Sequence, residues 1–220
     1  MNKCAQLVQA AYAQYAAFKS GAMWELPGDM VIVSTLSARP GGLFPHLEPF
    51  GFICRDEKSL YIVFRGTEST HDWLTNSDVD QVNHSYGKVH SGFEKLYNQM
   101  AGTIGSTVAK NTGFKIVVAG HSLGGSLATL AAFSLSAFNP TLYTFASPRV
   151  GDTDFAKNFN GAVPNANRII NTEDIVPTLP LPVCADTEYC HAGKPICFTF
   201  NSGTIVGNHS MDLYAKMAAA

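Results

Sequence analysis

Residues 114–120 read Phe-Lys-Ile-Val-Val-Ala-Gly, and this run limits the possible fold more than any other part of the sequence. A nearly continuous apolar run of this length is typical of a central parallel strand that is covered on both faces. A helical pattern over residues 123–138 follows almost at once and ends before Pro140. Because parallel strands need crossover connections, which are usually helices, this pair of segments predicts an α/β domain.

The other segments continue the alternation of strand and helix. Apolar residues at helical spacing predict an amphipathic helix over residues 2–19, ended by Gly21, and residues 22–49 are expected to form loops. Strands are expected at residues 50–54, 60–64, 141–146 and 168–171, a hairpin arm at 196–200, and helices at 92–110, 152–159 and 209–217. We therefore expect a single domain over residues 1–220, with a central, mostly parallel sheet flanked by helices.

Composition and charge exclude several classes of protein. Hydrophobic residues make up 46% of the chain and charged residues 15%, which permits a packed core and argues against disorder. The 15 basic and 17 acidic residues give a net charge of −2, and no two basic residues are adjacent, so a nucleic-acid groove or a polybasic membrane patch is not supported. The most apolar stretch, residues 127–138, is shorter than the ~20 residues of a spanning helix, so we expect a soluble protein with no transmembrane segment.

The N-terminal segment gives an expectation about location. It contains one lysine, but Gln6, Gln9 and Gln14 interrupt it, so it lacks the continuous apolar core of a signal peptide. Either the protein stays inside the cell or a leader has been removed. We expect a secreted protein whose leader is absent from this chain, and a cytoplasmic location stays open.

The chain has five cysteines, an odd number, and three of them, Cys184, Cys190 and Cys197, are close in sequence. Their spacing with His191 is too wide for a structural zinc site, in which paired ligands are typically separated by about two to four residues. A disulfide within the cluster is an open alternative, and it would indicate an oxidising compartment. Cys54 lies in an expected strand and is interpreted as a buried thiol.

The segment between the central strand and its helix carries the strongest chemical signal. Residues 120–125 read Gly-His-Ser-Leu-Gly-Gly, and Gly-x-Ser-x-Gly between a strand and a helix is the nucleophile elbow of the α/β hydrolases. Gly120 and Gly124 lack the Cβ atoms that would collide in so sharp a turn. The turn exposes the Ser122 hydroxyl, and the next helix points its N-terminus at the oxyanion that would form there. An ordinary glycine turn is the alternative, but the position of the motif favours a catalytic serine.

A nucleophilic serine needs a base, and the base needs an orienting acid. In this fold the chain order is serine, acid, histidine, so the base must follow Ser122 with room for an acid between them. His209 and His191 satisfy this order, and we favour His209 because His191 is expected to be solvated in the hairpin. Asp174 directly follows an expected strand, where ligand-facing loops leave a sheet, and Glu173 is its nearest rival.

Several further motifs accompany the elbow in a fixed order over roughly residues 50–215. The full set is Phe64-Arg65-Gly66-Thr67, Val89-His90-Ser91-Gly92-Phe93, the elbow at 120–125, Ala146-Ser147-Pro148-Arg149-Val150-Gly151, Asp174-Ile175-Val176-Pro177 and His209. This order resembles that of the class 3 lipases, a family that includes filamentous-fungal triacylglycerol lipases and related esterases. The resemblance implies an α/β-hydrolase fold and a catalytic triad of Ser122, Asp174 and His209.

The same resemblance implies the rest of the reaction machinery. Thr67, through its backbone amide and its hydroxyl, and Leu123, through its amide, would form the oxyanion hole. Two fixed donors of this kind are worth about 3 kcal/mol each at the developing alkoxide. Arg65 and Arg149 would tie loops together, and His121 is expected to neighbour the nucleophile only in sequence, since adjacent side chains at the elbow diverge. The chemistry requires no metal or organic cofactor.

In this family the segment after the oxyanion residue forms a lid over the acyl pocket. The corresponding residues 68–78 contain only two large apolar side chains, Trp73 and Leu74, among polar residues. On a short helix these two could cover the site when closed and contact lipid when open, and packing of Trp73 in the core is the alternative. So short and polar a lid leaves soluble esters open as substrates.

Together these observations predict a serine carboxylic-ester hydrolase, with a lipase acting on acylglycerols as the first expectation. A feruloyl, cutin or phospholipid esterase on the same scaffold is the alternative, because pocket shape sets acyl-chain preference. A catalytically silent relative that binds a lipid or a protein is disfavoured, since every triad and oxyanion position is filled. The expected partners are a lipid or other ester and, transiently, a lipid interface.

Overall fold

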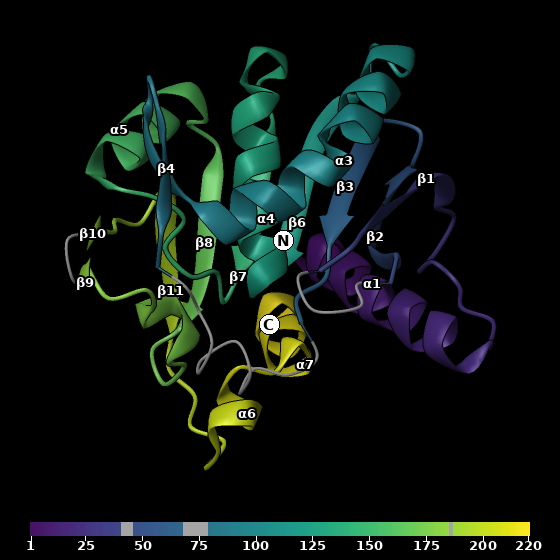
Figure 1. The fold of residues 1–220 in the computed structure, drawn as a ribbon. Coiled ribbons are helices and arrows are strands. Elements are labelled where there is room, and N and C mark those ends of the chain that lie inside the picture. The colour runs from purple at the N-terminus through teal and green to yellow at the C-terminus, as the bar shows by residue number, and fades with distance from the viewer. Residues whose placement is uncertain (41–45, 68–78, 185–186) are drawn as a thin grey trace.

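The computed structural model describes residues 1–40, 46–67, 79–184 and 187–220. In these ranges one sheet contains seven strands, and two short antiparallel pairs lie outside it (Figure 1). The strands of the sheet are β1 (Val31–Ala38), β2 (Glu48–Arg55), β3 (Ser59–Phe64), β6 (Lys115–His121), β7 (Thr141–Phe145), β8 (Ala166–Asn171) and β11 (Lys194–Phe198). The two pairs are β4 (Gln81–His84) with β5 (Gly87–His90), and β9 (Val183–Cys184) with β10 (Thr187–Glu188).

The large sheet is mostly parallel, as the sequence predicts. Its strand order is β1-β2-β3-β6-β7-β8-β11, and every pair from β3 onward is parallel. Only β2 runs against its neighbours, because a tight turn joins it to β3. Parallel strands all end at the same edge of a sheet, so the loops that leave β3, β6, β8 and β11 emerge together.

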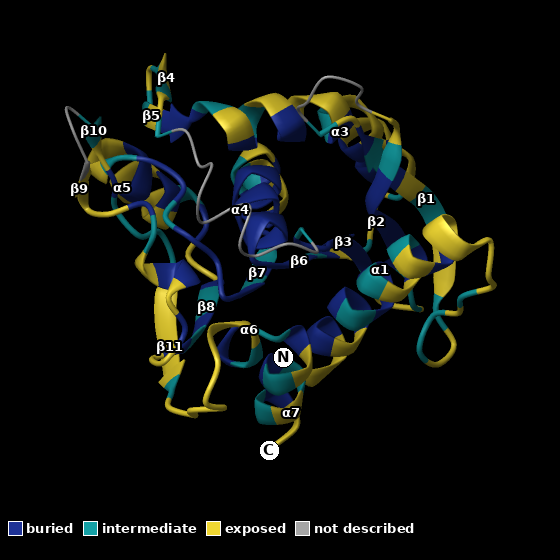
Figure 2. Ribbon diagram, turned by 60° about the horizontal axis from the view of Figure 1, so that its bottom comes forward, coloured by how far each residue is buried: buried dark blue, intermediate teal, exposed yellow. Residues whose placement is uncertain are grey.

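Helices cover both faces of the sheet (Figure 2). They are α1 (Asn2–Ser20), α3 (Ser91–Lys110), α4 (Leu123–Ser134), α5 (Thr153–Ala162), α6 (Ile205–Asn208) and α7 (Met211–Ala219), with 3-10 turns η1 (Ser136–Phe138) and η2 (Val176–Thr178). α1 and α7 pack on one face, and α3 and α4 pack on the other. No helix in the described ranges is long and apolar enough to cross a bilayer.

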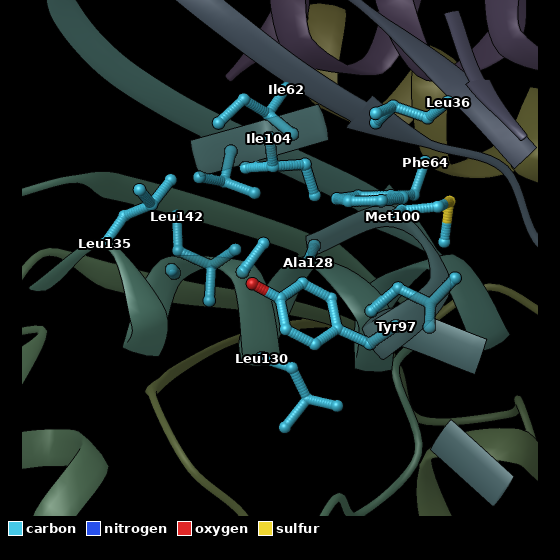
Figure 3. Packing of buried hydrophobic residues seen from close by; sticks show 14 of the residues in the cluster. Leu36, Ile62, Phe64, Tyr97, Met100, Ile104, Ala128, Leu130, Leu135 and Leu142 are labelled. Carbon is cyan, nitrogen blue, oxygen red and sulfur yellow. The ribbon is translucent and has the colours of Figure 1, made fainter. Parts of the chain in front are cut away.

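The two cores alternate along each strand, since successive side chains of a strand point to opposite faces. In β3, Ile62 and Phe64 join the core under α3 and α4, which Figure 3 shows from close by. Tyr61 and Val63 join the core under α1 and α7. Because both faces of the central strands are largely buried, their sequences are mostly apolar, which is the pattern that predicted them.

The structure differs from the sequence-based expectations at several elements. Residues 22–49, expected to form loops, contain β1. The helix expected over 123–138 ends at Ser134 and continues only as the 3-10 turn η1. The expected hairpin arm is β11, a parallel edge strand paired with β8. The closing helix expected over 209–217 begins only at Met211, because the Ser210 side chain caps α7 and leaves His209 outside it.

The cysteine cluster contains free thiols. Cys190 and Cys197 are both unpaired, so the structure has no disulfide between them, and the side chain of Cys184 lies outside the described part. Cys4 and Cys54 are buried, and burial raises the pKa of their thiols to about 11 and about 12. Within the described residues, no group of three or more His, Cys, Asp or Glu side chains could hold a metal ion.

Arg65 connects the end of β3 to the start of β2, which agrees with its expected role in tying loops together. Its guanidinium donates to the backbone oxygens of Pro49 (2.8 Å) and Gly66 (2.7 Å) and to Glu48 Oε1 (2.7 Å). The ring of Tyr15 lies 3.6 Å from the guanidinium carbon, and Arg65 is only 1% exposed. Three acceptors, each bonded to a different guanidinium nitrogen, suit the rigid fork of an arginine and not the single ammonium of a lysine.

We therefore expect Arg65→Lys to lower the free energy of unfolding by about 2 to 3 kcal/mol, because buried acceptors lose their donors. Urea denaturation monitored by circular dichroism measures this change. Arg39→Lys, at an exposed arginine, is the matched control and is expected to leave the unfolding midpoint unchanged. Equal stability of Arg65→Lys and the parent chain would contradict this role.

His191, the rival candidate for the base, is half-buried, contrary to the expectation that it is solvated. Its Nε2 donates to the Pro177 carbonyl oxygen at 2.8 Å. Burial, together with the nearby Arg168 and Arg149 charges, lowers the pKa of His191 from 6.5 to about 3. Between these two values the unfolded chain binds a proton that the folded chain does not, so stability is lost as the pH falls through this window.

The substitution His191→Gln tests this linkage, since glutamine can still donate to Pro177 but cannot ionise. We expect the loss of unfolding free energy between pH 7 and pH 4.5 to be smaller in the variant by about 1 to 2 kcal/mol. Urea titrations at the two pH values measure it. The exposed His46→Gln variant should lose as much stability as the parent chain, and a parent-like acid loss in His191→Gln would refute the assignment.

Candidate active site

Ser122 lies on a strained turn between β6 and α4. Its backbone angles are φ 57° and ψ −128°, and a positive φ is rare for a residue with a side chain. The Ser122 amide donates to the Phe145 carbonyl oxygen of β7 at 2.9 Å, which holds the turn against the sheet. Strain of this kind persists only where the surrounding structure enforces it, and it is concentrated at functional sites.

The glycines of the elbow are required by close backbone contacts, as the sequence predicts. A Cβ atom on Gly120 would lie 2.0 Å from the Gly124 carbonyl oxygen. A Cβ atom on Gly124 would lie 2.4 Å from the Arg65 carbonyl oxygen. The elbow is therefore pressed against both its own helix and the segment that leaves β3.

Asp174 and His209 form a buried hydrogen-bonded pair at the same edge of the sheet. His209 Nδ1 lies 2.8 Å from Asp174 Oδ2, and the two side chains are 5% and 0% exposed. Asp174 Oδ1 accepts from the Val176 amide at 3.0 Å, and Oδ2 also accepts from the Tyr214 hydroxyl at 2.8 Å. Three donors thus satisfy a carboxylate that would otherwise be costly to bury.

Tyr214 connects α7 to the acid. Its hydroxyl accepts from the Asn171 amide at 2.9 Å while donating to Asp174, and its ring is fully buried in the core under α1 and α7. Burial and the adjacent Asp174 charge raise the pKa of Tyr214, so the hydroxyl stays protonated and remains a donor.

Two asparagines tie the loop of His209 to the loop of Asp174. Asn171, at the end of β8, donates from its amide group to the carbonyl oxygens of Phe200 (2.9 Å) and Asn208 (3.2 Å). Asn208 in turn donates to the Glu173 carbonyl oxygen at 3.0 Å. Since the segment between β11 and α7 has few buried apolar residues, these polar cross-links hold His209 in place.

Ser122 is connected to this pair through its neighbour in the chain. His121 Nε2 lies 2.9 Å from the His209 carbonyl oxygen, and the two imidazole rings are 4.7 Å apart. In the described residues there is no hydrogen bond between the Ser122 hydroxyl and the His209 ring, and in many enzymes such contacts tighten only when substrate binds.

The expected oxyanion segment lies directly beside the elbow. A Cβ atom on Gly66 would come within 2.8 Å of Ser122 Cβ, so the backbone that leads into Thr67 passes against the nucleophile candidate. Thr67 and His209 line one cavity of about 470 Å³, which the start of α7 also borders. Leu123, the second expected donor, is the first residue of α4.

The alternative acid and base candidates are bonded to groups outside the site. Glu173, the rival acid, is exposed and accepts from Asn201, whereas His191 is engaged with Pro177. The expected lid residues, Trp73 and Leu74, lie outside the described residues.

The sequence predicts only that His121 does not face the nucleophile, and it did not reveal that the His121 side chain contacts His209. The sequence also gave no signal for Tyr12, Tyr214 or Asn208 as parts of the site. These residues occur in ordinary helical or loop patterns. Packing of α1 and α7 on the sheet brings Tyr12 and Tyr214 to the site, and the contact of Asn208 with the Glu173 carbonyl oxygen brings the end of α6 there.

Comparison with known proteins agrees with this geometry. The model of the family described as lipase (class 3) matches residues 61–184. A lipase of Rhizomucor miehei is 36% identical over an alignment of 171 residues that covers 71% of this chain and 46% of that protein. A secreted mono- and diacylglycerol lipase of Fusarium solani is 38% identical over an alignment of 133 residues that covers 56% of this chain and 40% of that protein. This chain thus matches less than half of the length of either relative.

Solved structures share the fold. A triacylglycerol lipase whose catalytic centre is described as a serine protease triad superimposes with a TM-score of 0.73 at 30% identity. The match covers 91% of this chain and 81% of that one. With a family model that matches more than half of its residues, this α/β-hydrolase chain belongs to the class 3 lipase family.

Proposed function

We propose that this chain is a serine carboxylic-ester hydrolase that acts on acylglycerols through an acyl-enzyme. The observation that carries the proposal is the buried Asp174–His209 pair, 2.8 Å between Nδ1 and Oδ2, beside the strained turn of Ser122. A nucleophile, a base and an orienting acid on separate loops at one sheet edge are the parts that acyl transfer needs. The names of the two relatives, lipase and mono- and diacylglycerol lipase, support acylglycerols as the substrate class.

In the proposed reaction, Ser122 Oγ attacks the ester carbonyl carbon and His209 Nε2 takes the hydroxyl proton. Asp174 accepts from Nδ1–H, which holds the ring in the tautomer whose Nε2 can act as a base and stabilises the imidazolium that forms. His209 then gives the proton to the leaving alcohol. A water molecule attacks the acyl-enzyme by the same route and releases the acid.

The proposed oxyanion donors are the amides of Thr67 and Leu123. Leu123 begins α4, whose first amides have no acceptor within the helix and whose dipole favours negative charge at this end. The contact between Gly66 and Ser122 supports the same role for the Thr67 amide. A donor fixed in advance stabilises the transition state without reorganisation.

The location and organisation of the chain are part of the proposal. We infer a secreted protein that contacts a lipid interface transiently, because a secreted relative acts on acylglycerols by its name and such esters gather at interfaces. Trp73 and Leu74 are proposed to cover the acyl pocket. A single domain over residues 1–220 is supported by the packing of α1 and α7, from opposite ends of the chain, on one face of the sheet.

A fluorophosphonate probe is expected to form one adduct, on Ser122, which mass spectrometry of the digested protein locates. Ser122→Ala should lose the adduct and lower kcat/KM for a p-nitrophenyl ester by about 10⁴-fold or more, since the acyl-enzyme cannot form. Ser126→Ala, at a fully buried serine one turn further along α4, is the control and should keep both labelling and activity. A folded parent chain that is not labelled would favour a silent binding protein.

A series of p-nitrophenyl and glyceryl esters from acetyl to oleoyl tests the substrate class. We expect kcat/KM to rise toward long acyl chains and the rate to increase when the substrate exceeds its solubility, because an interface then presents it. Initial rates across the solubility limit measure both effects. A maximum at short, soluble esters or at feruloyl esters would instead assign the chain to an esterase of another substrate class.

A further inference from the structure

A chain of hydrogen bonds joins the first helix to both sides of the proposed site. The Tyr12 hydroxyl of α1 lies 2.7 Å from His121 Nδ1, and the Gly66 amide donates to the same hydroxyl at 2.9 Å. His121 Nε2 lies 2.9 Å from the His209 carbonyl oxygen. These hydrogen bonds therefore run from Gly66, the residue before Thr67, to His121, the residue before Ser122. They end at the backbone of the proposed base, His209.

The direction of every bond in this chain is fixed by chemistry. A carbonyl oxygen can only accept, so His121 Nε2 must carry the proton that bonds to His209. Burial, followed by the nearby His209, lowers the pKa of His121 well below 6.5, so the ring is neutral and Nδ1 is an acceptor. Tyr12 must then donate its one hydroxyl proton to His121, which leaves its oxygen to accept from Gly66. Burial raises the pKa of Tyr12, so this proton is retained.

Packing restricts the movement of these groups. His121 is 3% exposed, and the rings of Tyr12 and Tyr214 lie at T-shaped angles to it, each with a centroid 5.8 Å away. A Cβ atom on Gly66 would lie 2.6 Å from the Tyr12 hydroxyl, so the oxyanion segment rests directly on that oxygen. A small shift of Tyr12 must therefore move either the Gly66 amide or the His121 ring.

We propose that Tyr12 and His121 are positioning residues that hold the oxyanion segment and the base loop at a fixed separation around Ser122. The proposal rests on the proposed function. Its physical basis is that Gly66 and His209, which lie on unrelated loops, are both bonded to one rigid pair. His121 can link Tyr12 to the base loop because a neutral imidazole accepts at Nδ1 and donates at Nε2. It also adds no second positive charge beside His209 when that ring takes a proton.

The substitution Tyr12→Phe removes the hydroxyl and keeps the ring. Loss of the shared acceptor releases the Gly66 amide and the His121 Nδ1 atom, so kcat should fall about tenfold while KM changes less than about twofold, as expected for misplaced catalytic groups. Rates are expressed per site labelled by the fluorophosphonate, so that unfolded protein does not count. The control is Tyr97→Phe, which removes another buried hydroxyl, bonded to Ser134 at 2.6 Å. Tyr97 belongs to the core under α3 and α4 (Figure 3), on the opposite face of the sheet from Tyr12. The control variant should leave kcat unchanged.

Nitrogen-15 NMR of the histidine rings provides a readout that does not depend on catalysis. We expect His121, assigned by its loss in His121→Gln, to show a protonated Nε2 and an unprotonated Nδ1 from pH 8 to pH 5. Its Nδ1 resonance should shift in Tyr12→Phe and stay in place in Tyr97→Phe.

The outcomes separate the two proposals. A parent chain that keeps the NMR signature but hydrolyses no ester overturns the proposed function. In an active parent chain, an undiminished kcat in Tyr12→Phe, or a His121 ring protonated on Nδ1, overturns the positioning role.

Discussion

The hydrogen bond between the Asp174 carboxylate and the His209 ring, formed where water is excluded, is the contact on which the rest of the site depends. A buried carboxylate is stable only when donors surround it, and here each donor comes from a different element. Val176 supplies a backbone amide, Tyr214 supplies a hydroxyl from α7, and His209 supplies its ring. To satisfy one acid, the chain must therefore bring its last helix against the edge of the sheet.

The same edge is organised by polar contacts more than by apolar packing. Loops that leave a sheet cannot bury much apolar surface, so hydrogen bonds from side-chain amides hold them in place. Asn171 and Asn208 join the loops of the acid and the base, and Arg65 joins the ends of two strands. If the hydrogen-bond chain through Tyr12 and His121 acts as proposed, the first helix belongs to this network too. Both ends of the described chain would then support the proposed catalytic centre.

Much of the fold could be predicted because its signals are local. The apolar run at 114–120 is β6, and the Gly21 stop of the first helix is found with a left-handed φ of 72°. The predicted elements were wrong where a tertiary contact or a single side-chain contact decides the secondary structure. The run at 196–200 has a strand pattern, but only the parallel pairing of β11 with β8 shows that this segment forms a sheet edge and not a hairpin arm. Likewise, the break before Met211 depends on the Ser210 cap, a contact of one side chain that hydropathy does not reveal.

The sequence by itself determined the elbow, the order of the candidate residues and the family, because steric demands on glycine and the spacing of motifs are written along the chain. The sequence favoured Asp174 over its neighbour Glu173, but only tertiary structure shows that Asp174 faces inward and contacts His209 while Glu173 is exposed. Tertiary structure alone also made His121 a partner of His209. Hydrogen bonds depend on positions within a few tenths of an ångström, and residues far apart along the chain acquire such positions only when helices pack against a sheet.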